Sequence, residues 1–441
     1  MTLETAPAMS SVFLFVCIAG PDRGKRLALT ATEALVGTDA SANLLSDDPD
    51  VTERFATLRF DGARLRIKGL AELLPFVDGH AVAEAVLTGG QQVRLGRSLW
   101  EVYAPGAAPS MMGFVNRLGD HLSNAAGIEK PGEWDAREMF ADVTKKHADE
   151  DVETYFTVGT LATTPPLSAI DGQWPKPWVF ARVFTFTVGL YVLFVLAWNH
   201  FQNDNLIPGL MMIGSVAVPL SLLIFFFEVN VPRNVSLYQV IKLLLIGGLA
   251  SIVVSLFFFQ WTGLSNWLGA ASAGIIEETG KALTLLLVAS KARFRWTLNG
   301  LLFGATVGTG FAVFESAGYA LDAAIGDGGS IEAMRQTIME RGVLSVLGGH
   351  VLWTGLVGAA LWRVRGDQPF RREMLADPRF IRVLLVCMAM HMVWNSPWHP
   401  PLYSKYIALG ACAWLLVLGM IQSGLKQVRE AQATPAATPA Q

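Results

Sequence analysis

The sequence predicts a two-part protein, with an all-β sandwich at the N-terminus followed by a polytopic α-helical membrane domain of about eight transmembrane helices. Composition predicts the membrane part, because only 16% of the residues are charged, whereas soluble domains have about 25%. The apolar excess is concentrated after residue 176. Before that point, short apolar runs are separated by Gly, Pro, Asn and Asp, which is the pattern of a sandwich of short strands.

The β-sandwich is expected over residues 11–104. Its strands are expected at the apolar runs Val12–Ile18, Leu27–Leu29, Ala56–Phe60, Leu65–Ile67, Gln92–Leu95 and Leu99–Tyr103. The first run has no basic stretch ahead of it and no small-residue cleavage site after it. We therefore interpret it as a buried strand and not as a signal peptide.

Glycine-containing motifs mark the turns of this part. They are Gly20-Pro21-x-x-Gly24, Leu35-Val36-Gly37 and the stretch Gly-Gly-Gln-Gln-Val-Arg-Leu-Gly at 89–96. Their order resembles that of a forkhead-associated (FHA) domain. The resemblance departs where phosphothreonine binding would need it, because Thr38 replaces the usual Arg and the Ser-x-x-His of the binding loop reads Thr52-Glu53-Arg54-Phe55. Without that Arg, charge-assisted bonds to a phosphate are largely missing. A degenerate FHA-like domain that docks a cytosolic protein partner or dimerises is therefore favoured over phosphopeptide capture.

Polar segments flank the membrane part on both sides. Residues 105–176 are expected to form a polar juxtamembrane linker with short helices, since 135–147 has weak helical periodicity. Prolines at its end break regular structure just before the membrane. At the other side, residues 426–441 are expected to be a disordered cytosolic tail.

Residues 177–425 are expected to form the membrane domain, because a helix of about 20 residues crosses a hydrocarbon core of about 30 Å. The candidate spans are 178–198, 207–228, 239–260, 266–290, 299–322, 343–363, 380–397 and 402–423. Basic residues gather in alternate connections, whereas the connections 199–206, 261–265 and 398–401 contain no Lys or Arg. The positive-inside rule then predicts a multi-pass protein of the bacterial inner membrane with both termini in the cytosol.

Ionisable side chains at membrane depth are confined to four consecutive spans. They are Glu277, Glu278 and Lys281 in the fourth span, Glu315 in the fifth, His350 in the sixth and His391 in the seventh. Each charge near the centre of a membrane helix costs roughly 2.5–3.5 kcal/mol, and such residues mark functional sites by default. One shared cavity that gathers all of them is the economical explanation.

The types of these residues suit the activation of water. Lys281 is four residues after Glu277 and three after Glu278, so both carboxylates can pair with it on one helix face. A carboxylate held in this way can act as a general base, and we favour Glu277 for that role. His350, His391 and Glu315 could bind Zn²⁺, or the histidines could act without metal as oxyanion donors. Asn395 follows His391 by four residues and could orient it or act as an oxyanion partner.

These residues also form a family pattern. Glu277-Glu278-x-x-Lys281 is followed by Phe311-x-x-x-Glu315, then by His350, and then by His391-Met-Val-Trp-Asn395. The set resembles the PrsW family of bacterial intramembrane proteases, in the superfamily of CAAX- and bacteriocin-processing proteases. The resemblance implies cleavage of membrane-anchored proteins. It assigns Glu277, Glu278, Glu315, His350 and His391 to the site, with Lys281, Asn395 and Phe311 in support. It leaves open whether the site holds a metal.

Three hypotheses of function follow from the sequence. The first is an intramembrane protease with an FHA-like regulatory domain, a membrane-anchored substrate and a lipid environment. The second is an ion or proton transporter that uses the same carboxylates and histidines, although the spans lack the paired, Gly/Pro-broken segments of inverted repeats. The third is an inactive scaffold, which the full set of polar groups argues against.

Charge and cysteine content exclude other classes. The net charge of −3 is too weak to indicate nucleic acid as a partner. Cys17, Cys387 and Cys412 are far apart and two of them lie in apolar spans. Neither a disulfide framework nor a thiolate metal site is therefore expected.

Overall fold

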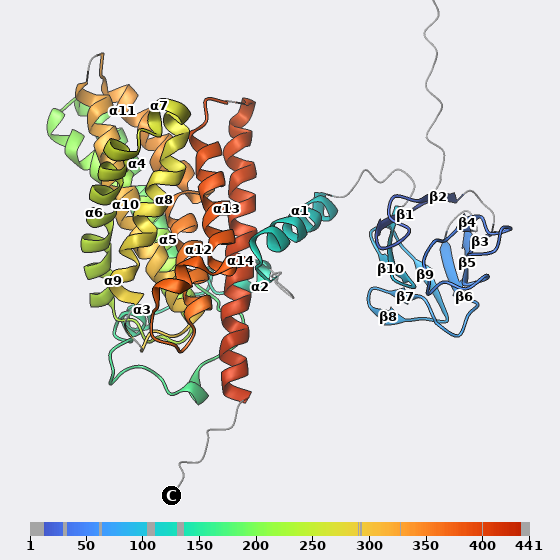
Figure 1. Cartoon of the computed structure of the whole chain (residues 1–441). Coiled ribbons are helices and arrows are strands. Elements are labelled where there is room, and N and C mark those ends of the chain that lie inside the picture. Colours follow the sequence, from blue (N-terminus) through green and yellow to red (C-terminus); the bar gives the residue numbers. More distant parts are fainter. Residues whose placement is uncertain are drawn as a thin grey trace, which may run out of the picture. The chain divides into compact units, whose positions relative to one another are not determined.

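The computed structural model describes residues 13–29, 33–60, 64–103, 111–129, 136–289, 291, 293–326, 328–398 and 400–433. The chain divides into two compact units, Met1–Arg117 and Leu118–Gln441. All strands of the described residues lie in the first unit, and the long helices lie in the second (Figure 1). The predicted fold class, a β-sandwich followed by a helical membrane domain, is confirmed.

The first unit consists of two sheets. Its strands are β1 (Phe13–Ala19), β2 (Arg26–Leu29), β3 (Glu33–Gly37), β4 (Leu44–Leu45), β5 (Ala56–Phe60), β6 (Leu65–Gly69), β7 (Phe76–Val77), β8 (His80–Ala81), β9 (Glu84–Leu87), β10 (Gln92–Leu95) and β11 (Ser98–Tyr103). One sheet has the order β2-β1-β11-β10-β7-β8, and the other has the order β4-β3-β5-β6-β9. Every predicted strand is present. The strands that were not expected are β3, β4 and β7 to β9, and of these β4, β7 and β8 have only two residues each.

The core between the sheets is built by alternation along the strands. In β1, Phe13, Phe15 and Cys17 are buried while their neighbours are partly exposed. The ring of Phe15 stacks on Trp100 of β11, with centroids 5.0 Å apart. A side chain at Gly37 would place its Cβ 1.9 Å from the carbonyl oxygen of Glu53, so this motif glycine is required for the close approach of two loops. Thr38, the residue that replaces the usual Arg of FHA domains, lies at this junction. Its N–H donates to Thr52 O.

The second unit is helical throughout. Its main helices are α4 (Val179–Phe201), α5 (Ile207–Val229), α6 (Leu237–Thr262), α8 (Ser272–Thr284), α10 (Thr297–Ile325), α12 (His350–Arg365), α13 (Pro378–Asn395) and α14 (Ser404–Ala433). Shorter helices connect or precede them: α1 (Met111–Ala126), α2 (Ala136–Met139), α3 (Asp149–Phe156), η1 (Leu167–Ala169), η2 (Asp204–Leu206), α7 (Ser265–Leu268), η3 (Gly269–Ala271), α9 (Leu286–Ala289), α11 (Ile331–Thr337), the π-helix η4 (Ile338–Val343), η5 (Leu344–Val346), η6 (Arg372–Ala376) and η7 (Pro401–Tyr403).

Six helices among the described residues are long and apolar enough to cross a membrane. The expected count of about eight is therefore too high by this measure, and the two remaining predicted spans are 266–290 and 380–397. The first is divided into α7, η3, α8 and α9, with Gly269 at φ +55° breaking its start. The second is α13, which is 18 residues long and includes Arg379, Arg382 and His391. The first therefore falls short because its longest helix, α8, has 13 residues, and the second because its polar residues lower its hydropathy.

Helix α10 is packed so closely on both sides that it positions its neighbours. A side chain at Gly304 would place its Cβ 2.0 Å from Thr354 O, and one at Gly308 would place it 2.2 Å from His350 O, so α12 lies directly against this stripe. On another side, a Cβ at Gly310 would be 2.3 Å from Leu244 O of α6. The close helix packing expected at Gly304-x-x-x-Gly308 is thus present. It places the first residue of α12, His350, beside α10.

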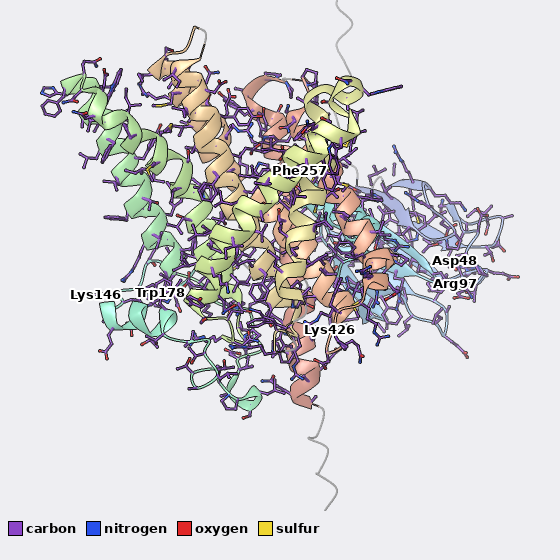
Figure 2. The ribbon with its side chains drawn as sticks, turned by 60° about the vertical axis from the view of Figure 1, so that its left-hand side comes forward. Asp48, Arg97, Lys146, Trp178, Phe257 and Lys426 are labelled. Carbon is purple, nitrogen blue, oxygen red and sulfur yellow. The ribbon has the colours of Figure 1, made fainter. Side chains whose placement is uncertain are left out.

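The expected linker has contacts with the membrane helices, and the expected tail needs correction. The described residues between Gly127 and Gly172 form a layer that is hydrogen-bonded to residues near the ends of the membrane helices. The bonds run from Arg363 to Gly127 O (2.6 Å), from Arg293 to Gly159 O (2.6 Å), from Arg429 to Gly172 O (2.8 Å) and from Gln432 to Ile170 O (2.7 Å). The tail was expected to be disordered from residue 426, but residues 426–433 continue α14. They are ordered because their side chains bind this layer, while 434–441 lie outside the described residues. Figure 2 labels Lys426 on α14 and Trp178 at the start of α4.

Candidate active site

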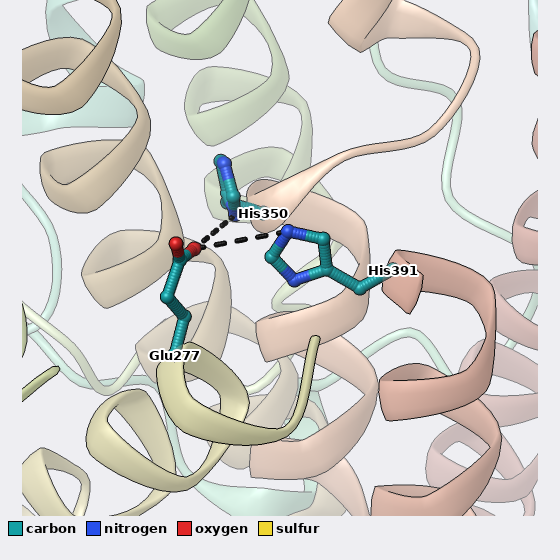
Figure 3. Close-up of side chains that lie close together, drawn as sticks. All are labelled: Glu277, His350 and His391. Atoms are coloured by element: carbon teal, nitrogen blue, oxygen red, sulfur yellow. Dashed lines mark ion pairs between the residues drawn. The ribbon is translucent and has the colours of Figure 1, made fainter. Parts of the chain in front are cut away.

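Four helices converge on one buried polar cluster, and this cluster contains every residue that the sequence predicted. Helix α8 contributes Glu277, Glu278 and Lys281; α10 contributes Phe311 and Glu315; α12 begins with His350; and α13 contributes His391 and Asn395. Figure 3 shows Glu277 pointing toward the rings of His350 and His391. The expectation of one shared cavity therefore agrees with the arrangement of these side chains.

The sequence places α8 at the centre of this cluster by means of small residues. A Cβ at Gly274 would lie 2.7 Å from Met388 O of α13, and a Cβ at Gly280 would lie 2.5 Å from Ser255 Oγ of α6. Glycine at these positions lets α8 approach both helices closely. Its carboxylates consequently come within reach of His391 on one side and of the α6 wall on the other.

Glu278 and Lys281 form a fully buried ion pair. Lys281 Nζ lies 2.6 Å from Glu278 Oε1, and both side chains have 0% of their surface exposed. The same carboxylate oxygen lies 3.0 Å from His391 Nδ1, and Lys281 Nζ also lies 2.8 Å from His350 Nδ1. The ammonium is 4.4 Å above the ring of Phe311. The pair thus neutralises two charges and fixes one nitrogen of each histidine.

Glu315 forms the second ion pair, with an arginine that the sequence analysis did not select. Glu315 Oε2 lies 2.7 Å from Arg341 Nη2 and 2.9 Å from His350 Nε2. Arg341 lies in the π-helix η4, and its guanidinium is 3.9 Å above the ring of Tyr319. The expected sixth span began at residue 343, so Arg341 was counted with the connecting loop. No sequence signal distinguishes it from the nearby Arg335, whose partner Glu332 is largely exposed.

Glu277 is the carboxylate that remains without a close cationic partner. Its Oε2 atom is 3.7 Å from His391 Nε2 and 4.0 Å from both Lys281 Nζ and His350 Nδ1. Only 5% of Glu277 is exposed, and Oε2 has no hydrogen-bond partner among the described residues. Oε2 of Glu278 and Oε2 of Glu315 also lack a hydrogen-bond partner among the described residues, but each of those carboxylates has a cation within 2.7 Å. Glu277 is therefore distinguished by the absence of a close cation.

The donor atoms of Glu277, His350 and His391 also suit a metal ion. One ligand atom from each lies within 4.8 Å of the others, and two imidazoles with one carboxylate form a donor set of catalytic zinc. The other ring nitrogen of each histidine faces a carboxylate, Glu315 for His350 and Glu278 for His391, as is usual around metal-binding histidines. The nitrogen that His350 would offer to a metal, Nδ1, lies 2.8 Å from Lys281 Nζ, so a metal would have to replace this contact. The carboxylate in this set is Glu277, whereas the sequence analysis named Glu315.

A cavity of about 660 Å³ opens onto this cluster. Its inner wall is buried. Around Glu277 this wall consists of the small side chains of Ser255, Ser272 and Ala273 together with the ring of Phe311. Its outer part includes Leu256 and Tyr319, which are 61% and 51% exposed. Phe257, labelled in Figure 2, lies next to Leu256 and is also exposed. The cavity therefore connects an apolar outer surface with the unpaired carboxylate.

Fold and site together define a polytopic membrane protein with a buried cluster of carboxylates and histidines. Residues 219–423 match the model of the PrsW family, described as PrsW family intramembrane metalloprotease, and this segment contains the whole cluster. The resemblance inferred from the motifs is thereby confirmed. No curated protein matches the chain in sequence.

The N-terminal part is similar to solved FHA domains. A phosphothreonine-dependent FHA domain is 24% identical, covering 21% of this chain and 95% of that one, with a TM-score of 0.20. The FHA domain of a Chlamydia trachomatis protein is 23% identical, covering 21% and 97%, with a TM-score of 0.20. The cytoplasmic domain of the T3SS sorting platform protein PscD from P. aeruginosa is 24% identical, covering 22% and 82%, with a TM-score of 0.21.

Proposed function

We propose that this protein is an intramembrane protease that hydrolyses a peptide bond of a membrane-anchored protein with water activated by Glu277. One observation supports this choice above the others. Of the three carboxylates in the cluster, Glu278 and Glu315 each have a cation within 2.7 Å, whereas Glu277 has none closer than 3.7 Å and lines the cavity. A general base must have a free oxygen facing the substrate.

The reaction then assigns a task to each neighbour. Glu277 takes a proton from water as the water oxygen bonds to the carbonyl carbon, and later gives that proton to the departing amine. Glu278 and Lys281 hold the rings of His391 and His350 at their Nδ1 atoms. Asn395 Nδ2 lies 3.2 Å from His391 Nε2 and orients the other side of that ring. In the alternative metal-dependent mechanism, Glu277, His350 and His391 would hold a zinc ion, which would supply the Lewis acid, and Glu277 would be a ligand in place of the general base.

The shape of the cavity suits a substrate that arrives from the membrane. Its exposed rim includes the apolar residues Leu256 and Ala270, and its buried wall includes the small side chains of Ser255, Ser272 and Ala273, which leave room for an extended peptide. We propose that the substrate segment enters beside α6, in a bacterial inner membrane with both termini of the protease in the cytosol. The FHA-like domain would then dock or regulate from the cytosol. Transport is the less favoured alternative, since the family match is to a protease.

The proposal is tested with purified protein in liposomes on a panel of single-span bacterial membrane proteins. Wild type is expected to cleave at least one of them, and Glu277→Gln is expected to remove cleavage while leaving the protein folded. Asp322→Asn, on the same helix as Glu315 but outside the cluster, serves as the control with wild-type activity. Cleavage that survives Glu277→Gln would show that another group activates water.

The same preparation tests the metal. If a metal activates the water in place of Glu277, elemental analysis should give about one bound Zn²⁺ per chain in wild type and a loss of that zinc in His391→Ala, because this substitution removes one of the three donors. His80→Ala, a surface histidine of β8, is the matched control. Zinc that remains bound in His391→Ala would contradict the assignment of the ligands.

A further inference from the structure

Hydrolysis at this site needs a donor for the negative charge that develops on the carbonyl oxygen. The histidines are the obvious candidates, but their N–H groups are already engaged. The Lys281 ammonium can only donate, so His350 Nδ1 accepts from it and His350 carries its proton on Nε2, toward Glu315. The Glu278 carboxylate can only accept, so His391 carries its proton on Nδ1 and its Nε2 faces Asn395 as an acceptor.

Two hydroxyls of the cavity wall are also engaged, and the amide of Asn395 faces His391. The hydroxyl of Ser255 donates to Ser251 O (2.8 Å), and the hydroxyl of Ser272 donates to Gly269 O (2.7 Å). Arg341 is different. It lines the same cavity as Glu277, and its guanidinium has five N–H groups, of which Nη2 faces Glu315. Its Nε is buried and has no hydrogen-bond partner among the described residues.

We infer that Arg341 is a further catalytic residue, which binds the carbonyl oxygen of the scissile bond and stabilises the oxyanion formed on it. This inference rests on the proposed function. When water adds, the new C–O bond forms and the carbonyl π electrons move onto the oxygen, where the guanidinium donates to them. When the tetrahedral species collapses, those electrons re-form the carbonyl, the C–N bond breaks, and the amine leaves with the proton held by Glu277.

The surroundings of Arg341 suit this task. Glu315 fixes one edge of the guanidinium and the ring of Tyr319 lies 3.9 Å from its central carbon, so the group is held in place before substrate arrives. Glu315 also balances most of the charge, which leaves the arginine available as a donor without an uncompensated buried cation. Removing one such preorganised donor typically lowers kcat by about 10²–10³-fold.

The test compares Arg341→Gln and Arg341→Lys with wild type on a panel substrate that wild type cleaves. We expect Arg341→Gln to lower kcat by about 100-fold or more with KM nearly unchanged, because the interaction is made mainly in the transition state. Arg341→Lys, which keeps the charge but not the planar fork, should lose less. Arg335→Gln is the control, since Arg335 belongs to the same connection but pairs with an exposed Glu332, and should cleave like wild type.

A second comparison separates chemistry from the positioning of Glu315. Binding of the same substrate is measured in Glu277→Gln and in the double variant Glu277→Gln with Arg341→Gln, neither of which can complete the reaction. The inference is supported if these two variants bind the substrate with equal affinity while Arg341→Gln alone loses kcat. It is overturned if Arg341→Gln keeps more than half of wild-type kcat, or if it only raises KM. It is equally overturned if Glu315→Gln and Arg341→Gln lower kcat alike and their combination is no worse. Wild-type cleavage that depends on Glu277 would leave the proposed function standing in each case.

Discussion

Lys281→Met is the substitution that most directly tests how the buried charges are held. The ammonium has 0% exposure and lies 2.6 Å from Glu278, whose side chain is also at 0%. Methionine keeps the length and apolar stem of lysine but removes the charge. It leaves the Glu278 carboxylate with the N–H of His391 as its remaining close partner.

The expected cost follows from that uncompensated charge. Removing one partner of a buried ion pair costs about 3–5 kcal/mol, whereas replacing both partners with neutral groups is often close to neutral. We therefore expect Lys281→Met to lower the free energy of unfolding by an amount in that range. The double variant Glu278→Gln with Lys281→Met should recover most of it. Lys291→Met, at an exposed lysine bonded to Gln239, is the matched control with little expected change.

Reversible unfolding in mixed micelles, followed by tryptophan fluorescence, measures these differences. The reasoning would be refuted by a Lys281→Met protein as stable as wild type, or by a double variant less stable than the single one. Either result would mean that the pair is not held together by mutual neutralisation. Activity is expected to fall in all variants of this pair, so stability and cleavage should separate in the double variant.

Two further predictions concern packing and pH. Gly304→Ala should destabilise the membrane unit by about 1–3 kcal/mol, because the added Cβ would lie 2.0 Å from Thr354 O. Gly318→Ala on the same helix should not, because nothing lies within 4 Å of its Cβ. Equal free energies of unfolding for the two variants would contradict the close contact of α10 and α12. In the β-sandwich, burial alone would raise the pKa of Asp22, but bonds from Lys25, Ser46 and the N–H of Asp47 outweigh it and leave the pKa below its ordinary value. Since the pKa of Asp22 is depressed in the folded protein, the stability that its carboxylate contributes is present above the pKa of an unfolded Asp. That contribution is lost as the pH falls through the folded pKa. Urea unfolding of this unit should show the loss of stability at low pH in wild type and not in Asp22→Asn. If the free energy of unfolding has the same pH dependence in both proteins, Asp22 is not the source of that dependence.

The sequence predicted those parts of the fold that have a clear periodicity. Strands such as β5 and β10 alternate apolar and polar residues between turn signals, and they lie where they were expected. The pair β7 and β8 has only two residues in each strand, which is too short for any periodicity. Such strands exist because their neighbours in the sheet supply the hydrogen bonds, and this is tertiary information.

The sequence named residues that the structure brings into one cluster, but it did not predict how they pair. Helical spacing placed Glu277 and Glu278 near Lys281, yet it could not show that Lys281 lies 2.6 Å from Glu278 and 4.0 Å from Glu277. That difference leaves Glu277 free, and it depends on where α12 and α13 place their histidines. Arg341 was overlooked because a π-helix carries it from an apparent loop into the cluster.

The two predicted spans that fall short of a membrane helix are the ones that supply most of the chemistry. Helices α8 and α13 contribute Glu277, Glu278, Lys281, His391 and Asn395, and each of these residues lowers the hydropathy of its own helix. Such helices are stable at membrane depth only if apolar neighbours surround them and if their polar groups face one another. The glycine contacts of α8 with α6 and α13 meet the first condition, and the ion pairs meet the second. On the proposed function, stability and catalysis therefore depend on the same contacts. A variant that loosens α8 should lose activity before the apolar helices around it unfold.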